Sequence, residues 1–199
     1  MTRTFGGAVL LLLLFLTLAP PAAAGPFDHP GYAKAFTCSA CHGLAGNSKS
    51  DVMPILAGLD PAYLQKALED YAAGRRPSPE MEPYAKMALH VGVAEVAGYF
   101  ASQKREPTPV KADASAIARG KAAAAPCAAC HGNDGRGDKA KLIPALAGQP
   151  PGYLASQIRL FREDRRSPED ASLTQVKAVM KSIPDATIAD LAAWYSSLR

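Results

Sequence analysis

Apolar residues recur with helical spacing in two stretches of the chain that lie ninety positions apart. In residues 62–73 they fall three or four positions apart, on one face of a helix that begins after Asp60-Pro61 and ends at Gly74. The first face consists of Tyr63, Leu64, Ala67, Leu68 and Tyr71, and the second of Tyr153, Leu154, Gln157, Ile158 and Phe161. Further helices are predicted for residues 93–102 and 186–198, and no segment alternates as a strand does. The pattern predicts an all-α protein.

The likeness of the two stretches belongs to a duplication that runs through most of the chain. Residues 54–58 read PILAG and residues 144–148 read PALAG, and the arginine pair at 75–76 recurs at 165–166. Residues 96–100 match residues 191–195 at an offset of ninety-five, so the second copy has gained five residues. Repeats of this length predict tandem domains rather than a solenoid of shorter units. We expect domain 1 at residues 25–105, a linker at 106–112 stiffened by Pro107 and Pro109, and domain 2 at 113–199.

The first 24 residues have the pattern of a secretory signal peptide. Arg3 supplies the positive start, residues 8–18 are apolar, and Ala22-Ala23-Ala24 offers small residues for cleavage before Gly25. The apolar run is shorter than the ~20 residues that a membrane-spanning helix needs. We therefore expect cleavage near Ala24 and a periplasmic mature chain, with an uncleaved membrane anchor as the alternative.

All four cysteines of the chain lie in two copies of one pattern, Cys-x-x-Cys-His, which is the attachment signature of c-type haem. On one helical turn, two sulfurs three positions apart can reach the two vinyl groups of one porphyrin, while the adjacent histidine faces the iron. We predict two covalently bound haem c groups, each at the end of a helix that closes near Gly43 or Gly132. Cys38 and Cys41 are predicted to attach the first haem and His42 to ligate its iron; Cys127 and Cys130 are predicted to attach the second, with His131 as its iron ligand.

Two other interpretations of the cysteines are weaker. A single zinc ion could take the two Cys-x-x-Cys pairs as four thiolates, but this leaves the histidine after each pair unexplained. In an exported protein the four cysteines could also form two disulfides, in any of three pairings.

The ligand on the other side of each iron decides whether the site carries electrons or binds a substrate. In the first half, Met81 follows Pro77-Ser78-Pro79-Glu80, a stretch that predicts a loop able to cross the haem face. We assign Met81 to the first iron. The local rivals are Met53, Met87 and His90.

The second half does not reproduce this methionine. The two offsets of the repeat lead from Met81 to Ala171 and to Val176. Met180, one helical turn beyond Val176, is assigned to the second iron. Deprotonated Lys177 or Lys181 is an alternative ligand, and an open or water-bound iron is another.

Charge excludes some partners. Residues 25–105 hold eight basic and eight acidic residues, whereas residues 113–199 hold twelve and nine. Four ionised haem propionates would bring the exported protein close to neutral, so the formal charge of +4 does not indicate nucleic-acid binding. Neither a Walker sequence nor Gly-x-Gly-x-x-Gly after a strand occurs, so nucleotide chemistry is not expected.

Several features of the chain carry a resemblance to a known family: the haem motifs, the Pro-x-Leu-Ala-Gly segments, Tyr-Leu followed by Gln157-Ile158-x-x-Phe161-Arg162, the arginine pairs, Met81 and the closing residues 185–194. On these features the chain resembles the dihaem cytochrome c4 family. It also resembles the related cytochrome subunit of flavocytochrome c sulfide dehydrogenase. The resemblance covers nearly the whole mature chain. It implies two class I cytochrome c domains, related by pseudo-twofold symmetry with their haems close at the interface, and methionine on both irons. It further implies that the arginine pairs lie near propionates or at that interface.

The leading interpretation is a carrier of single electrons, not an enzyme, in a respiratory or sulfur-oxidising chain. The partners implied are redox proteins, namely a terminal oxidase, a quinol-oxidising complex or a flavoprotein dehydrogenase; peripheral association with a membrane is left open. One alternative is the cytochrome subunit of a sulfide- or thiosulfate-oxidising enzyme. Another is a catalytic or sensing second haem with an open sixth position.

Overall fold

The computed structural model describes residues 25, 27–167 and 169–199, and the predicted signal peptide lies outside them. The helices before the connector are α1 (Tyr32–Ala35), α2 (Ser39–His42), α3 (Pro61–Ala72), α4 (Met81–Val91) and α5 (Val93–Ser102). Those after it are α6 (Ala114–Ala123), α7 (Ala125–His131), α8 (Pro151–Arg162), α9 (Thr174–Lys181) and α10 (Asp185–Ser197). Short 3-10 turns η1–η4 lie at Phe36–Cys38, Leu44–Gly46, Lys139–Lys141 and Ala171–Leu173. The described residues contain no β-strand, so the predicted all-α class is confirmed.

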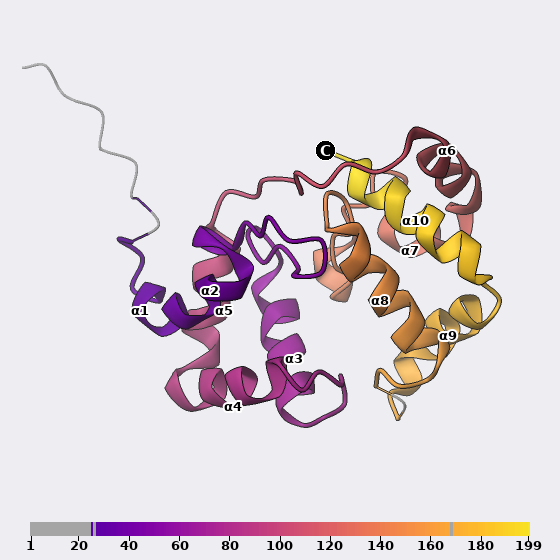
Figure 1. Cartoon of the computed structure of the whole chain (residues 1–199). Helices are drawn as coiled ribbons and strands as arrows, with labels where there is room; N and C mark the ends of the chain where they lie inside the picture. Colours follow the sequence, from indigo (N-terminus) through magenta and orange to yellow (C-terminus); the bar gives the residue numbers. More distant parts are fainter. Residues whose placement is uncertain (1–24, 26, 168) are drawn as a thin grey trace, which may run out of the picture.

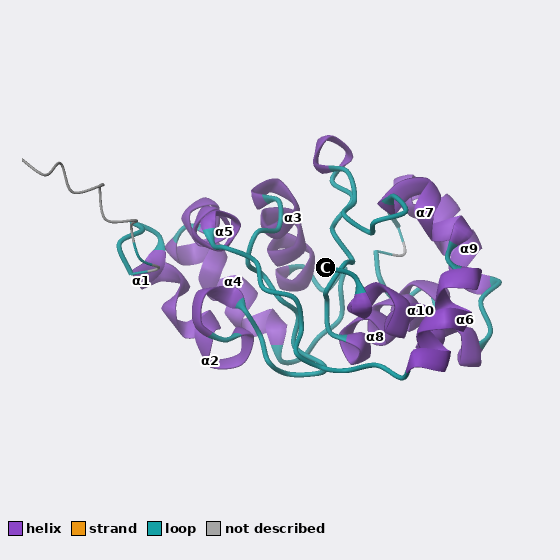
Figure 2. Cartoon of the chain, turned by 90° about the horizontal axis from the view of Figure 1, so that it is seen from above, coloured by secondary structure: helices purple, strands orange, loops and turns teal. Residues whose placement is uncertain are grey.

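The helices form two groups that correspond to the two halves of the sequence. Figures 1 and 2 show α1–α5 on one side and α6–α10 on the other, joined by an extended connector. The connector, residues 104–113, contains no helix. No helix in the described ranges is long and apolar enough to span a membrane.

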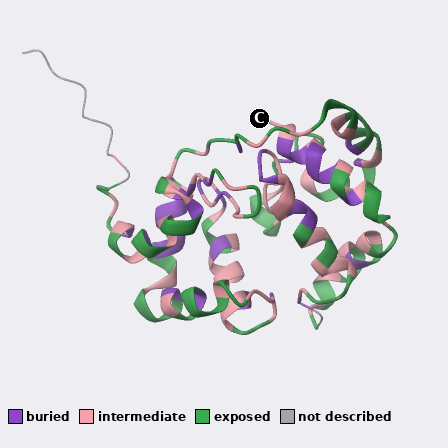
Figure 3. Ribbon diagram, in the orientation of Figure 1, coloured by how far each residue is buried: buried purple, intermediate pink, exposed green. Residues whose placement is uncertain are grey.

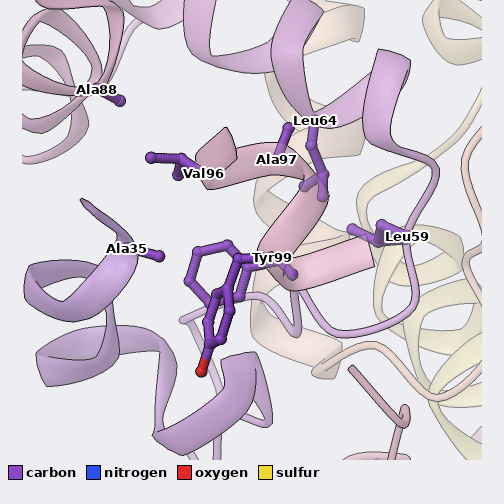
Figure 4. Close-up of a cluster of buried hydrophobic side chains, with 8 residues drawn as sticks. Ala35, Leu59, Leu64, Ala88, Val96, Ala97 and Tyr99 are labelled. Atoms are coloured by element: carbon purple, nitrogen blue, oxygen red, sulfur yellow. The ribbon is translucent and has the colours of Figure 1, made fainter. Parts of the chain in front are cut away.

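Each half has its own apolar core, formed mainly by its last helix and the helix that follows the PxLAG segment. Figure 3 shows buried residues on these helices and in the loops beside them. The buried core of the first half, drawn in Figure 4, consists of Ala35, Leu59, Leu64, Ala88, Val96, Ala97, Tyr99 and Phe100. The buried core of the second half consists of Ala124, Leu154, Ala155, Ile188, Leu191, Ala192 and Tyr195. The cores occupy equivalent positions in the two repeats.

A glycine allows the first and last helices of each half to cross closely. A Cβ atom on Gly31 would lie 2.3 Å from the backbone oxygen of Glu95, and one on Gly120 would lie 1.9 Å from that of Asp190. Real Cβ atoms essentially never approach other atoms this closely. Any side chain at these two positions would therefore force the helices apart.

The predicted helices agree with the structure better than the predicted connections do. Asp60 caps α3 by accepting from the Tyr63 amide at 3.0 Å, Pro61 opens the helix, and Gly74 follows it with a φ of +72°. Helices α5 and α10 begin and end within one residue of the predicted bounds. Three features were missed: α4, α9, and the division of each haem-motif helix into two short helices. Pro83 does not prevent α4, because it lies in the first turn, where a missing N–H costs little.

Candidate functional site

The His42 side chain lies at the end of α2 and is held by one hydrogen bond. Its Nδ1 lies 2.9 Å from the Pro54 carbonyl oxygen, which can only accept, so Nδ1 carries the proton. Burial lowers the pKa of His42, which favours the neutral ring. The Nε2 atom is buried and has no hydrogen-bond partner. A neutral imidazole with a free, buried Nε2 lone pair is the state that ligates a metal ion.

His131 repeats this arrangement at the end of α7. Its Nδ1 lies 2.9 Å from the Pro144 carbonyl oxygen, and burial lowers the pKa of its ring as well. Both helices end at a glycine, Gly43 or Gly132, each with a φ of +76°. The positive φ ends the helix directly after the histidine and turns the chain away. The predicted end of each haem-motif helix is therefore confirmed.

A cavity of about 740 Å³ opens beside His42. Its wall includes His42, Cys38, Cys41 and Met81, together with apolar side chains of the first core. Met81 is the first residue of α4 and follows the loop at residues 77–80. Of its rivals, Met53 also lines the cavity, whereas Met87 and His90 do not belong to its wall. The size lies within the ~300–1,000 Å³ usual for cofactor pockets, and the donors fit a haem with two thioether bonds and one axial nitrogen.

The other interpretations of the cysteines find no support. All four are free thiols, so the disulfide framework is absent. Among residues 25, 27–167 and 169–199, no group of three or more His, Cys, Asp or Glu side chains could hold a metal ion, so the four-thiolate zinc site does not form. Each cysteine pair lies in its own half, half-buried at its first member and exposed at its second.

In the second half, the candidate haem-binding residues lie on two different helices. Cys127, Cys130 and His131 lie on α7, and Met180 is half-buried in the last turn of α9. The Nζ of Lys177, the alternative ligand, donates to the Ser167 carbonyl oxygen at 2.6 Å and pairs with the Asp164 carboxylate at 2.9 Å. The assignment of Met180 stays a prediction.

Cavity residues also come from the second half, because α8 packs against the first haem site. Tyr153, Gln157 and Arg165 are among them. Arg76 is 2% exposed and donates to the Tyr153 hydroxyl at 2.7 Å and to Gln157 Oε1 at 2.7 Å. Arg166 donates to the same Gln157 oxygen at 2.8 Å and to the Tyr63 hydroxyl of the first half at 3.5 Å. The predicted interface position is therefore confirmed for Arg76 and Arg166.

These arginines create a positive environment between the halves. Burial by itself lowers the pKa of Arg76, but the surrounding tyrosine oxygens more than offset this, and the net direction is upward. Burial raises the pKa of Tyr63, but Arg76 and Arg166 outweigh it, and the net direction is downward. The Arg76 guanidinium therefore remains charged at neutral pH, where it can neutralise anionic groups such as carboxylates.

Two interface residues, Asp51 and Gln149, were not anticipated from the sequence. Gln149 corresponds to Leu59 in the first repeat, and the helix start after it has Pro150 where α3 has the cap residue Asp60. The absence of a capping side chain before α8 was the one sequence signal that a residue of the other half caps this helix.

Fold and site together define a c-type cytochrome with two covalently attached haems. The family model described as cytochrome c matches residues 117–199. Over 94% of its length the chain is 33% identical to cytochrome c4 of Pseudomonas aeruginosa, covering 96% of that protein. The chain belongs to the cytochrome c4 family.

Two further similarities agree with this. The crystal structure of reduced recombinant cytochrome c4 from Pseudomonas stutzeri superposes with a TM-score of 0.77 at 28% identity, covering 85% of this chain and 97% of that one. The thiosulfate dehydrogenase electron acceptor of Stutzerimonas stutzeri is 29% identical over 82% of this chain and 80% of its own. The relatives are electron-transfer proteins, so the chain is an electron-transfer protein rather than an enzyme.

Proposed function

We propose that the mature chain is a periplasmic carrier that passes single electrons between redox proteins of a respiratory or sulfur-oxidising chain. The observation that carries the proposal is the buried, unpartnered Nε2 of His42 beside two thiols at the wall of an apolar cavity. Haem c, when bound, supplies reversible one-electron chemistry at its iron. The residues of this chain attach, orient and shield it.

The proposed site has a defined division of roles. Cys38 and Cys41 attach the first haem, and Cys127 and Cys130 attach the second. His42 and His131 serve as axial ligands on one side of each iron. Met81 and Met180 serve on the other side. Domains at residues 25–105 and 113–199 each hold one haem.

The wall of the first cavity favours electron transfer over substrate chemistry. Leu56, Leu64 and Phe100 belong to it, and such side chains exclude water from the iron. Arg76 and Arg166 supply the fixed positive charge that suits propionate carboxylates at the interface. A dry site with fixed ligands needs little rearrangement when one electron enters or leaves.

A purified, exported protein tests the proposal directly. We expect a haem spectrum that persists after extraction with acidified organic solvent, at a ratio of two haems per chain. We also expect export to the periplasm after removal of the first 24 residues, which N-terminal sequencing would detect. A colourless protein, or pigment released into the solvent, would contradict the proposal.

A second candidate function is acceptance of electrons from a thiosulfate-oxidising enzyme. The specific support is the likeness to the thiosulfate dehydrogenase electron acceptor of Stutzerimonas stutzeri. Stopped-flow mixing of the oxidised protein with thiosulfate dehydrogenase and thiosulfate would show rapid haem reduction if this candidate is right. Reduction no faster than by thiosulfate alone would exclude it.

A further inference from the structure

The two halves are joined at the loop that orients His42. The Gln149 side chain, 2% exposed, bonds at both ends to the backbone of Ile55, which is fully buried. Its Oε1 accepts from the Ile55 amide at 2.9 Å, and its Nε2 donates to the Ile55 carbonyl oxygen at 2.8 Å. One side chain from the second half thus satisfies both backbone groups of a buried residue in the first. Buried backbone groups are costly to leave unpaired, so this contact fixes Ile55 firmly.

Asp51 fixes the other end of the same loop. Its carboxylate accepts from the Gly152 amide at 2.9 Å, and its carbonyl oxygen accepts from the Tyr153 amide at 3.0 Å. These two amides belong to the first turn of α8, which has no side-chain cap within its own half. Asp51 therefore caps a helix of the other half.

Pro54 lies between these two attachment points. Its carbonyl oxygen accepts the hydrogen bond from His42 Nδ1. The position of this oxygen depends on Asp51 and Ile55, and both are held by residues of the second half. The hydrogen bond that orients His42 is therefore fixed across the interface.

The equivalent loop of the second half contacts its partner differently: Ala145 packs against the apolar core of the first half, but the hydrogen bonds of nearby Ile143 are local. Ile143, adjacent to Pro144, exchanges two backbone hydrogen bonds of 2.9 Å with Asp138 of the same half. Leu59, which corresponds to Gln149, has no polar side-chain atom. The carbonyl that orients His131 is thus fixed locally.

We infer that Gln149 is a positioning residue for the axial histidine of the first haem, so that its two hydrogen bonds to Ile55, rather than docking of the halves in general, tune the reduction potential of the first haem but not of the second. The inference rests on the proposed function, in which His42 ligates iron. A hydrogen bond from Nδ1–H to a carbonyl makes the Nε2 of an imidazole more basic and favours the ferric state. Loosening the loop at residues 51–55 weakens that bond and raises the potential of the first haem.

The test uses the full-length holoprotein with Gln149→Leu, the residue of the equivalent position in the first repeat. The matched control is Arg105→Met. Arg105 also joins the halves, donating to the carbonyl oxygens of Ala57 and Ala147 at 3.2 and 2.9 Å, and both acceptors lie outside the loop at 51–55. Spectroelectrochemical titration measures the potential of each haem.

We expect Gln149→Leu to increase the ratio of reduced to oxidised first haem about threefold at a fixed potential, or ~28 mV at 59 mV per tenfold change for one electron. The second haem should not shift. In the reduced protein, exchange of the His42 Nδ1 proton measured by NMR should accelerate about tenfold, while that of His131 stays constant. Arg105→Met should leave both readouts of the first haem unchanged.

Equal shifts in both variants, or a shift at both haems, would overturn the inference and indicate general loosening of the interface. No shift and no change in exchange would also overturn it. If Gln149→Leu does not fold, Gln149→Glu keeps the acceptor for the Ile55 amide but loses the donor, and a smaller shift in the same direction is expected. Absence of covalent haem from the unmodified protein would instead contradict the proposed function.

Discussion

At the scale of single residues, the two candidate methionines occupy different positions. Met81 opens α4 directly after a proline-containing loop and lines the cavity beside His42. Met180 lies in the last turn of α9, in a stretch that carries the inserted residues of the second repeat. A helix end is better fixed by its hydrogen bonds than a loop is, so Met81 is a well-positioned donor beside His42. The distinct contexts predict that the two irons differ in potential.

Replacing the methionines one at a time tests both assignments. We expect Met81→Ala to open the first iron and Met180→Ala the second, because alanine has no donor atom. Carbon monoxide should then change the spectrum of one reduced haem per variant, and the weak absorption near ~695 nm that marks methionine-ligated ferric haem should fall by about half.

The unmodified protein is the control and should not bind carbon monoxide. If its second haem already binds the gas, the sixth position there is open, and the sensing or catalytic alternative is favoured. Met87→Ala, which changes a methionine outside the cavity wall, should leave both haems unchanged.

At the scale of secondary-structure elements, the crossing of the first and last helices holds each half together. Helices α6 and α10 meet at Gly120, where the backbone of Asp190 occupies the space of a side chain. Arg119 reinforces this crossing through two hydrogen bonds of 2.8 Å to the Asp190 carboxylate. The crossing places α10 in the apolar core of the second half, next to the haem motif on α7.

We expect Gly120→Ala to destabilise the protein by about 1–3 kcal/mol or more, because its Cβ would overlap the Asp190 carbonyl group. Thermal and denaturant unfolding of the holoprotein would measure this. The control is Gly98→Ala in α5, where nothing lies within 4 Å of the added Cβ. That substitution should stabilise the protein by about 0.5–1 kcal/mol, as alanine favours a helix over glycine. Similar losses for both variants would show that the close crossing is not the cause.

At the scale of the whole molecule, several polar contacts join the halves, and Ala145 of the second half packs against the apolar core of the first. Ser167 donates its amide to the Arg75 carbonyl oxygen at 2.6 Å, and Thr108 in the connector donates to that of Gly148 at 2.8 Å. Arg105 bridges two carbonyl oxygens that are equivalent in the repeats, and burial lowers its pKa to about 10, which leaves it charged at neutral pH. Directional contacts of this kind fix the relative orientation of the halves more than they add stability.

Asp51→Ala tests the cap that one half provides for the other. Loss of the carboxylate should cost about 1 kcal/mol of stability and accelerate amide hydrogen exchange at Gly152, in the first turn of α8. The control, Asp60→Ala, removes the local cap of α3 and should lower the stability by a similar free energy. It should accelerate amide exchange at Tyr63 but leave exchange at Gly152 unchanged. Unchanged exchange at Gly152 in Asp51→Ala would refute the capping role across the interface.

The sequence predicted those features that depend on residues close together in the chain. Asp60, Pro61 and Gly74 bound α3 because caps act within one turn, and Gly43 and Gly132 mark the ends of the haem-motif helices for the same reason. No helix was predicted at α4, because Pro77 and Pro79 indicated only the loop before it, which the structure contains. The prediction also missed Gln149 and Asp51, because their partners lie 94 and 101 positions away and no local pattern encodes such pairing.

The sequence by itself determined the all-α class, the duplication and the two Cys-x-x-Cys-His motifs, because helical spacing and attachment chemistry act over a few residues. Only the tertiary structure decided that His42 carries its proton on Nδ1 and that Met81 lines the same cavity. It also decided that Gln149 of the second half fixes the loop at residues 51–55. These features arise where distant segments pack and exclude water. Burial then requires each polar atom to find a partner, and the fold selects which one it finds.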